Sequence, residues 1–191
     1  MKTFKLLMLT SAMCALANTA LAVDGTINFS GEIVGGTCKV TAGAGTSVSG
    51  DTLGDYKVVV PLGKVGLESL KNDGITASRA IHLDVNCENL PTTISAVKIN
   101  FDPLSGSGID EGDMNLLKIT GSAKGVGIAL YDNENNLINM AANESVSDMF
   151  EGADEGAKTA TLSMRAGFKT NGEELVAGEA VGTLPFTLTY E

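Results

Sequence analysis

Residues 182–191 read Gly182-Thr183-Leu184-Pro185-Phe186-Thr187-Leu188-Thr189-Tyr190-Glu191, and this stretch decides the fold. Its residues alternate, so a strand here has one apolar face, made by Leu184, Phe186, Leu188 and Tyr190. Chain termini usually fray unless a sheet holds them. Such an apolar terminus therefore predicts a strand with neighbours on both sides, one of which can belong to another molecule.

A second alternating stretch lies near the other end of the chain, at residues 25–33. In a strand, Ile27, Phe29, Gly31 and Ile33 would lie on one face, and the residues between them, which are polar, on the other. The pattern alone leaves two interpretations open. The stretch is either the first strand of a complete domain, with Gly31 at a bulge, or a strand that one copy lends to the next.

The first 22 residues have the features of a secretory signal peptide. A basic start at residues 1–5 precedes an apolar run at residues 6–17, and Ala20-Leu21-Ala22 is a small-x-small cleavage site. The apolar run is shorter than the roughly 20 residues that span a bilayer. We therefore expect cleavage after Ala22 and an exported, soluble mature chain.

Cleavage leaves two cysteines, Cys38 and Cys87, because Cys14 is removed with the signal. Two cysteines in an exported chain, without CxxC spacing, predict one structural disulfide. A metal site is the alternative, but His82 is the only histidine and zinc needs more ligands of this kind.

Composition excludes several classes of function. The 191-residue chain carries 13 Lys and Arg against 23 Asp and Glu, a formal net charge of −10, which argues against nucleic acid or anionic membranes as partners. Residues 23–191 are the length of one domain. With 23 Gly and no Trp, the chain is expected to be all-β.

Short alternating segments separated by turns support this expectation. Pro61 interrupts one of them and indicates an edge or a bulge, and residues 67–70 form at most a helical turn. The strands are predicted at residues 56–65, 80–87, 93–102, 116–120, 125–131 and 160–169 and in the terminal stretch. This spacing fits a β-sandwich better than an α/β fold.

The sequence contains no pattern of catalytic, metal-binding or phosphate-binding residues. His82 is expected to be an ordinary strand residue. Asp110, Glu111 and Asp113 are interpreted as a solvated acidic loop rather than a cation site, and residues 132–136 lack the Gly and terminal Glu of a calcium loop. We therefore predict no enzymatic activity, no metal and no cofactor.

Taken in order, several features resemble pilin-domain subunits of chaperone/usher fimbriae, most closely the major subunits of type 1-like pili. They are the alternating N-terminal extension, Cys38, Pro61-Leu62-Gly63-Lys64-Val65, Cys87, Gly125-Val126-Gly127-Ile128, Phe168-Lys169-Thr170-Asn171-Gly172 and Tyr190. Two features depart from the family pattern. Pro185 removes a backbone donor from the final strand, and Gly36-Thr37 precedes Cys38.

The resemblance implies an immunoglobulin-like sandwich of six strands that lacks its seventh. It divides the chain into a signal peptide (1–22), a donor-strand extension (23–36) and a pilin domain (37–191). Donor-strand exchange would then place Ile27, Phe29 and Ile33 in pockets of a neighbouring subunit, with Gly31 where a side chain would clash. Leu184, Phe186, Leu188, Tyr190 and the Glu191 carboxylate would border the acceptor groove and form the surface that a chaperone recognises.

The implied function is that of a structural fimbrial subunit that supports cell adhesion. The implied partners are neighbouring pilin subunits in a homopolymer, a periplasmic chaperone, an outer-membrane usher, and tip adhesin or adaptor subunits. The fibre would lie on the surface of a Gram-negative bacterium, reached through the periplasm. The alternative is a minor adaptor, or a shaft subunit that binds a receptor glycan directly.

Overall fold

The computed structural model describes residues 37–43, 46–50, 56–70, 75–152 and 157–191. These residues belong to one compact unit, Val34–Glu191. The predicted signal peptide and donor extension lie outside the described residues, so the division of the chain into three parts stays a prediction. None of the helices in the described ranges is long and apolar enough to cross a membrane.

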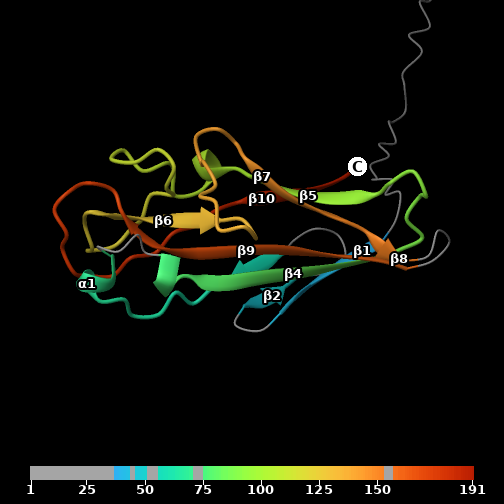
Figure 1. Cartoon of the computed structure of the whole chain (residues 1–191), viewed down its shortest axis with the longest axis horizontal. Helices are drawn as coiled ribbons and strands as arrows, with labels where there is room; N and C mark the ends of the chain where they lie inside the picture. Colours follow the sequence, from blue (N-terminus) through green and yellow to red (C-terminus); the bar gives the residue numbers. More distant parts are fainter. Residues whose placement is uncertain (1–36, 44–45, 51–55, 71–74, 153–156) are drawn as a thin grey trace, which may run out of the picture. The chain divides into compact units, whose positions relative to one another are not determined.

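The larger of two main sheets is antiparallel and runs in the order β1-β4-β9-β6 (Figure 1). It comprises β1 (Thr37–Ala42), β4 (Arg79–Glu88), β9 (Lys158–Thr170) and β6 (Val126–Tyr131), with the two-residue β8 (Glu151–Gly152) also paired to β9. The strand β1 is therefore an edge of this sheet.

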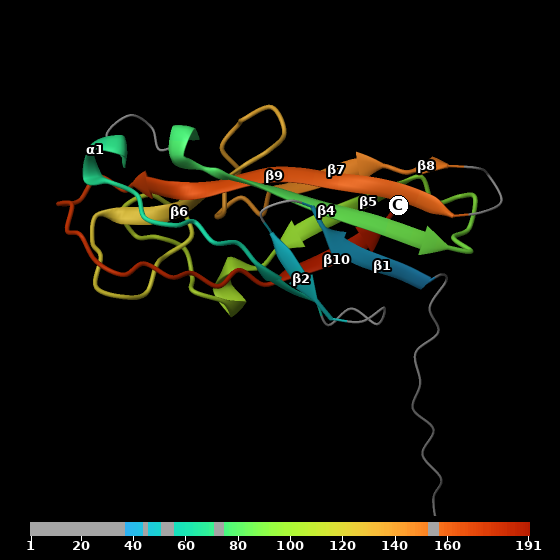
Figure 2. The same ribbon diagram turned by 90° about the horizontal axis from the view of Figure 1, so that it is seen from below.

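The second sheet has the order β10-β5-β7, from β10 (Phe186–Tyr190), β5 (Ala96–Phe101) and β7 (Ser145–Met149). Its edge strand β10 is the last strand of the chain. A separate two-stranded ribbon pairs β2 (Ser47–Ser49) with β3 (Lys57–Val59). Short helical turns complete the structure: α1 (Leu67–Leu70), η1 (Ile75–Ala77) and η2 (Pro103–Ser105). Figure 2 shows β1 and β10 along the same long side of the two layers.

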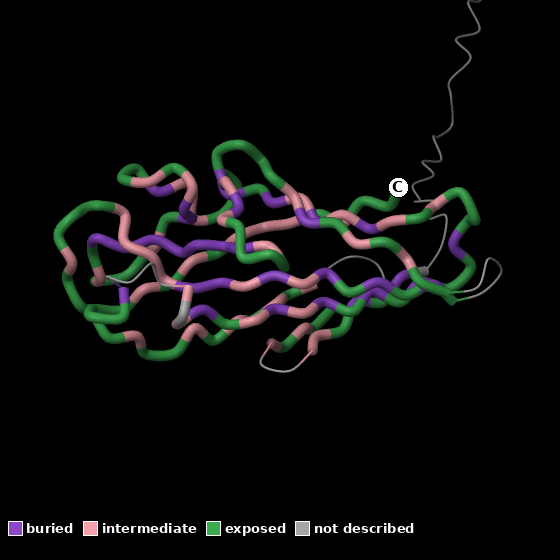
Figure 3. The backbone as a smooth tube through the Cα atoms, in the orientation of Figure 1, coloured by how far each residue is buried: buried purple, intermediate pink, exposed green. Residues whose placement is uncertain are grey.

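The core lies between the two sheets and follows from the alternation of their strands (Figure 3). In β4, the side chains of Ile81, Leu83, Val85 and Cys87 are all buried, as the sequence predicted. From the other sheet, Val97, Ile99 and Phe101 of β5 enter the same apolar cluster. The all-β sandwich expected from the sequence is confirmed.

The strand predictions are confirmed for the long segments and need correction for the short ones. Residues 116–120 form isolated bridges rather than a strand, at Leu117 and Thr120. Strand β3 ends before Pro61, and β10 begins after Pro185, because proline has no N–H to donate to a ladder. The described residues form ten strands, several only two or three residues long, whereas the alternating segments predicted seven and the family resemblance implied six.

The segment that leads into β10 is attached to the sandwich by several hydrogen bonds, two pairs of which form isolated β-bridges. Val176 and Lys124 exchange backbone hydrogen bonds at 3.1 Å, and Val181 and Thr120 do so at 2.7 and 2.9 Å. Gly121 permits this approach, because its φ of +117° and the nearby backbone oxygen of Glu179 leave no room for a Cβ. These bridges fix where β10 starts.

Candidate functional site

Strand β10 is paired with β5 on one side only. Glu191 and Ala96 exchange two backbone hydrogen bonds of 2.9 Å, and Asp102 N–H donates to the Pro185 carbonyl at 2.8 Å. Paired and unpaired residues alternate in an antiparallel ladder, so the odd-numbered residues of β10 turn their backbone toward β5. The even-numbered ones, Phe186, Leu188 and Tyr190, direct N–H and C=O away from it, and no strand of the described ranges pairs with that edge.

The side chains of β10 divide in nearly the same way, except that the even-numbered Tyr190 at its end is 36% exposed. Phe186 and Leu188 are half-buried and pack against the main apolar cluster, whereas Thr187 and Thr189 are exposed. The open edge of β10 therefore combines unpaired backbone groups with apolar side chains. The donor that Pro185 lacks would have faced β5, so this proline does not interrupt the open edge.

The edge of β1 has the same character. Gly43 N–H donates to the His82 carbonyl at 3.0 Å, which continues the ladder with β4. By alternation, Cys38, Val40 and Ala42 turn their backbone away from β4. Cys38 and Val40 are also buried, at 7% and 4% exposure. This second edge was not predicted from the sequence. A signal for it was present, because a Cys38 that faces Cys87 puts Val40, two residues later, on the same inward face.

A disulfide joins β1 to its neighbour. Cys38 and Cys87 are directly opposite each other in the β1–β4 register, and their sulfur atoms are bonded. The predicted pairing is thus confirmed. The disulfide therefore fixes β1 to β4 at Cys38, a residue whose own backbone N–H and C=O point away from β4.

Aromatic side chains contact both edge strands: Tyr190 is the last residue of β10, and Tyr56 contacts β1. The Tyr190 ring stacks on Phe150 with centroids 6.4 Å apart, and the Tyr56 hydroxyl donates to the Cys38 carbonyl at 3.0 Å. Burial raises the pKa of Tyr190, and the nearby Tyr56 raises it further. Tyr56 therefore contacts the edge strand β1 and affects the ionisation of a residue of β10, which its sequence context did not indicate.

Glu191 was expected to present its terminal carboxylate to a chaperone. In the structure its main-chain oxygen accepts hydrogen bonds from the N–H groups of Ser95 and Ala96 at 2.6 and 2.9 Å. The Glu191 side chain lies 3.6 Å from Lys98. Leu184 is half-buried against the core cluster, beside the start of β10. The predicted donor residues Ile27, Phe29, Gly31 and Ile33 lie outside the described residues.

The acidic loop at residues 110–113 was predicted to be solvated, but its Asp110 carboxylate is buried and hydrogen-bonded within the protein. Asp110 is 6% exposed and accepts hydrogen bonds from the N–H groups of Gly112 and Asp113 and from the Asn171 amide. Glu111 pairs with Lys118 at 2.7 Å. No group of three or more metal-ligating side chains occurs in the described part of the chain.

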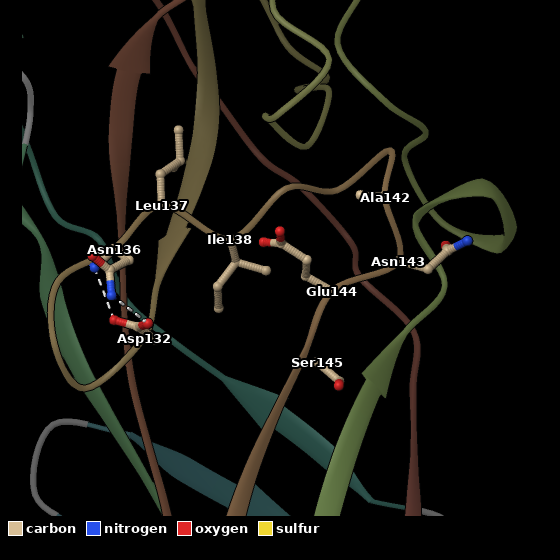
Figure 4. A pocket seen from close by; sticks show the side chains of 8 residues that line it. All are labelled: Asp132, Asn136, Leu137, Ile138, Ala142, Asn143, Glu144 and Ser145. Atoms are coloured by element: carbon tan, nitrogen blue, oxygen red, sulfur yellow. Dashed lines mark hydrogen bonds between the residues drawn. The ribbon is translucent and has the colours of Figure 1, made fainter.

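An open depression of about 610 Å³ is lined by residues of the 132–145 segment. Figure 4 shows the side chains that line it. Its carboxylates already have protein partners: Asp132 accepts from Asn136, and Glu144 accepts from the Asn139 N–H at 2.7 Å. Partial burial raises the pKa of Asp132, but hydrogen bonds from Asn136 and Glu134 outweigh it, and the pKa lies below its ordinary value. The depression offers no support for direct glycan binding.

The family model for "Fimbrial protein" matches residues 27–191. This chain belongs to the fimbrial protein family. It is 28% identical to the long polar fimbria protein A of Salmonella typhimurium over 95% of this chain and 93% of that protein. It is 31% identical to the type-1 fimbrial protein A chain of Escherichia coli, over 64% of this chain and 62% of that one.

Other similarities cover less of the sequence or are more distant. The serotype 3 fimbrial subunit of Bordetella pertussis is 36% identical over 56% of this chain, and the match spans about half (48%) of that protein. Among solved structures, the P pilus rod subunit PapA aligns with a TM-score of 0.44 at 15% identity, over 87% of this chain and 100% of its own. The CupB6 tip adhesin of Pseudomonas aeruginosa aligns with a TM-score of 0.49 at 21% identity, over 67% of this chain and 34% of that chain.

Proposed function

We propose that this fimbrial subunit polymerises by strand donation, with residues 23–36 of one copy inserted between β1 and β10 of the next. The observation that carries the proposal is a pair of open strand edges bordering one apolar core. An inserted strand would pair with the backbone of both edges and cover the core between them. Chaperone–pilin complexes use this mode of recognition, in which an extended segment adds a strand to a sheet edge.

The proposed occupant suits these edges chemically. Its alternation puts Ile27, Phe29 and Ile33 on one face of a strand. Inserted in the groove, that face would meet Val40 of one edge and Leu188 of the other, which both belong to the apolar cluster. Burying three such side chains contributes roughly 5 to 9 kcal/mol as an upper estimate. Each backbone hydrogen bond adds about 0.5 to 1.5 kcal/mol. Because all of these contacts must break together, the fibre is expected to dissociate very slowly.

The same edges explain the other partners that we propose. A subunit with two unpaired strand edges would need a temporary strand before it reaches the fibre, and a periplasmic chaperone would supply it along β10. The acceptor surface would then be Leu184, Phe186, Leu188, Tyr190 and Glu191. An outer-membrane usher would exchange that strand for the next subunit's extension, and the finished fibre would support adhesion without catalysis. Neighbouring pilins and a tip adhesin or adaptor complete the assembly.

A matched pair of donor variants tests the proposal. Phe29→Asp would leave an unpaired carboxylate in an apolar pocket, which costs several kcal/mol. Asn28→Asp adds the same charge one residue away, on the polar face. We expect Phe29→Asp to abolish fibres on the cell surface while Asn28→Asp assembles normally, as seen by electron microscopy and by immunoblots of sheared fibres.

A second pair tests the acceptor side. Leu188→Asp places a charge on the apolar face of β10, whereas Thr187→Asp places it on the exposed face. Only Leu188→Asp should prevent a synthetic peptide of residues 23–34 from binding the refolded mature chain. If the peptide bound neither variant nor the parent, or if Phe29→Asp assembled normally, residues 23–36 would be an ordinary first strand and the proposal would be wrong.

A further inference from the structure

The end of the β1 edge near the disulfide is already occupied by a side chain of the same subunit. By the alternation of the β1–β4 ladder, the carbonyl of Cys38 faces the open side. The Tyr56 hydroxyl donates to that oxygen at 3.0 Å. Tyr56 therefore holds a backbone acceptor that a strand inserted along β1 would also need.

The position of the Tyr56 ring makes this contact more than a local hydrogen bond. Tyr56 directly precedes β3, and its half-buried ring packs against the same apolar cluster as Phe186 and Leu188. It is also close enough to Tyr190 to affect the ionisation of that phenol. The side chain thus contacts β1 directly and packs against the apolar cluster that Phe186 and Leu188 of β10 also cover.

We propose that Tyr56 gates the groove by competing with the incoming strand for the Cys38 carbonyl. This inference rests on the proposed strand donation. While the hydroxyl is bound, a strand can pair with Val40 and Ala42 but not with Cys38. Complete insertion requires the phenol to leave, so Tyr56 limits the rate of insertion and weakens the binding of strands that extend to this end.

The test measures insertion of a fluorescent peptide of residues 23–34 into the refolded mature chain. Every protein in the test carries Phe29→Asp, so that copies cannot donate to one another. Tyr56→Phe keeps the ring and removes only the competing hydroxyl. Because one net hydrogen bond is lost from the free state, we expect the peptide to associate about 2- to 12-fold faster and to bind tighter by a similar factor.

Tyr131→Phe is the matched control. It removes the same hydroxyl group from β6, at the opposite edge of the sheet from β1, and should leave the association rate unchanged. If Tyr56→Phe does not refold, as judged by circular dichroism and an intact disulfide, Tyr56→Leu provides an apolar side chain without the hydroxyl. The same acceleration is expected for that variant.

The outcomes separate this inference from the proposed function. If the peptide binds the parent and Tyr56→Phe binds it at the same rate or more slowly, Tyr56 is not a gate, although strand donation stands. If the peptide fails to bind the parent, the Tyr131 control and the Tyr56 variants alike, strand donation itself fails, and the gate fails with it. Faster and tighter binding by the Tyr56 variants alone supports the gate.

Discussion

Replacement of Asp110 by alanine should strongly destabilise the subunit, although this carboxylate lies in a loop that resembles an ordinary acidic turn. Asp110 is 6% exposed and accepts hydrogen bonds from the N–H groups of Gly112 and Asp113 at 2.9 and 3.1 Å. It also binds the Asn171 amide with both oxygens, at 3.0 and 3.1 Å. The side chain therefore ties the loop before residue 116 to the turn after β9.

The magnitude follows from the donors that would lose their acceptor. Asp110→Ala removes the acceptor of two backbone N–H groups and of one side-chain amide, and a donor without an acceptor costs about 1 to 3 kcal/mol where water cannot reach it. Because Gly112 is exposed and Asp113 and Asn171 are half-buried, water can replace part of this loss, and we expect about 2 to 5 kcal/mol. Asp110→Asn keeps an acceptor for the backbone but places one amide NH₂ against that of Asn171, for an expected loss of about 1 to 3 kcal/mol.

Urea unfolding of the mature chain, followed by circular dichroism, measures both losses from the shift of the midpoint at constant slope. Glu111→Gln is the control, because Glu111 neighbours Asp110 but is exposed and pairs only with Lys118 at the surface. Ion pairs at the surface contribute little to stability, so this variant should unfold at the same urea midpoint as the parent. The reasoning is refuted if Asp110→Ala is no less stable than Glu111→Gln.

Two further predictions concern the groove-bordering strands. Cys87→Ser should lower the free energy of unfolding by about 2 to 4 kcal/mol, because the bond to Cys38 closes a long loop; an unchanged urea midpoint would contradict this. Tyr190 should ionise above its ordinary pKa, and Tyr56→Phe should bring that pKa part of the way back, as followed by near-ultraviolet absorbance. Because the pKa of Tyr190 is raised in the folded state, its contribution to the free energy of unfolding is complete below about pH 10. That contribution is lost as the pH rises through the pKa of the folded state. A Tyr190 that titrates with its ordinary pKa would contradict this prediction.

The sequence was most informative where a strand is long and buried on one face. In β4, the alternation of Ile81, Leu83, Val85 and Cys87 was enough to give the strand, its inward face and the orientation of one cysteine. It was least informative for short segments. The sequence analysis did not predict β7, because its five residues include only one buried apolar side chain, Val146.

Alternation, the prolines and the cysteines are local properties, so the sequence by itself determined the all-β class, the disulfide and the one-sided character of the last strand. The backbone partners of an edge are not local, because they depend on which strands lie beside each other across the whole chain. Only the tertiary structure could therefore decide that β1 is the second open edge, that the donor missing at Pro185 lies on the paired side of β10, and that the Tyr56 hydroxyl reaches the Cys38 carbonyl. The sequence separates Tyr56 from Cys38 by 18 residues, and nothing in the pattern between them indicates that contact.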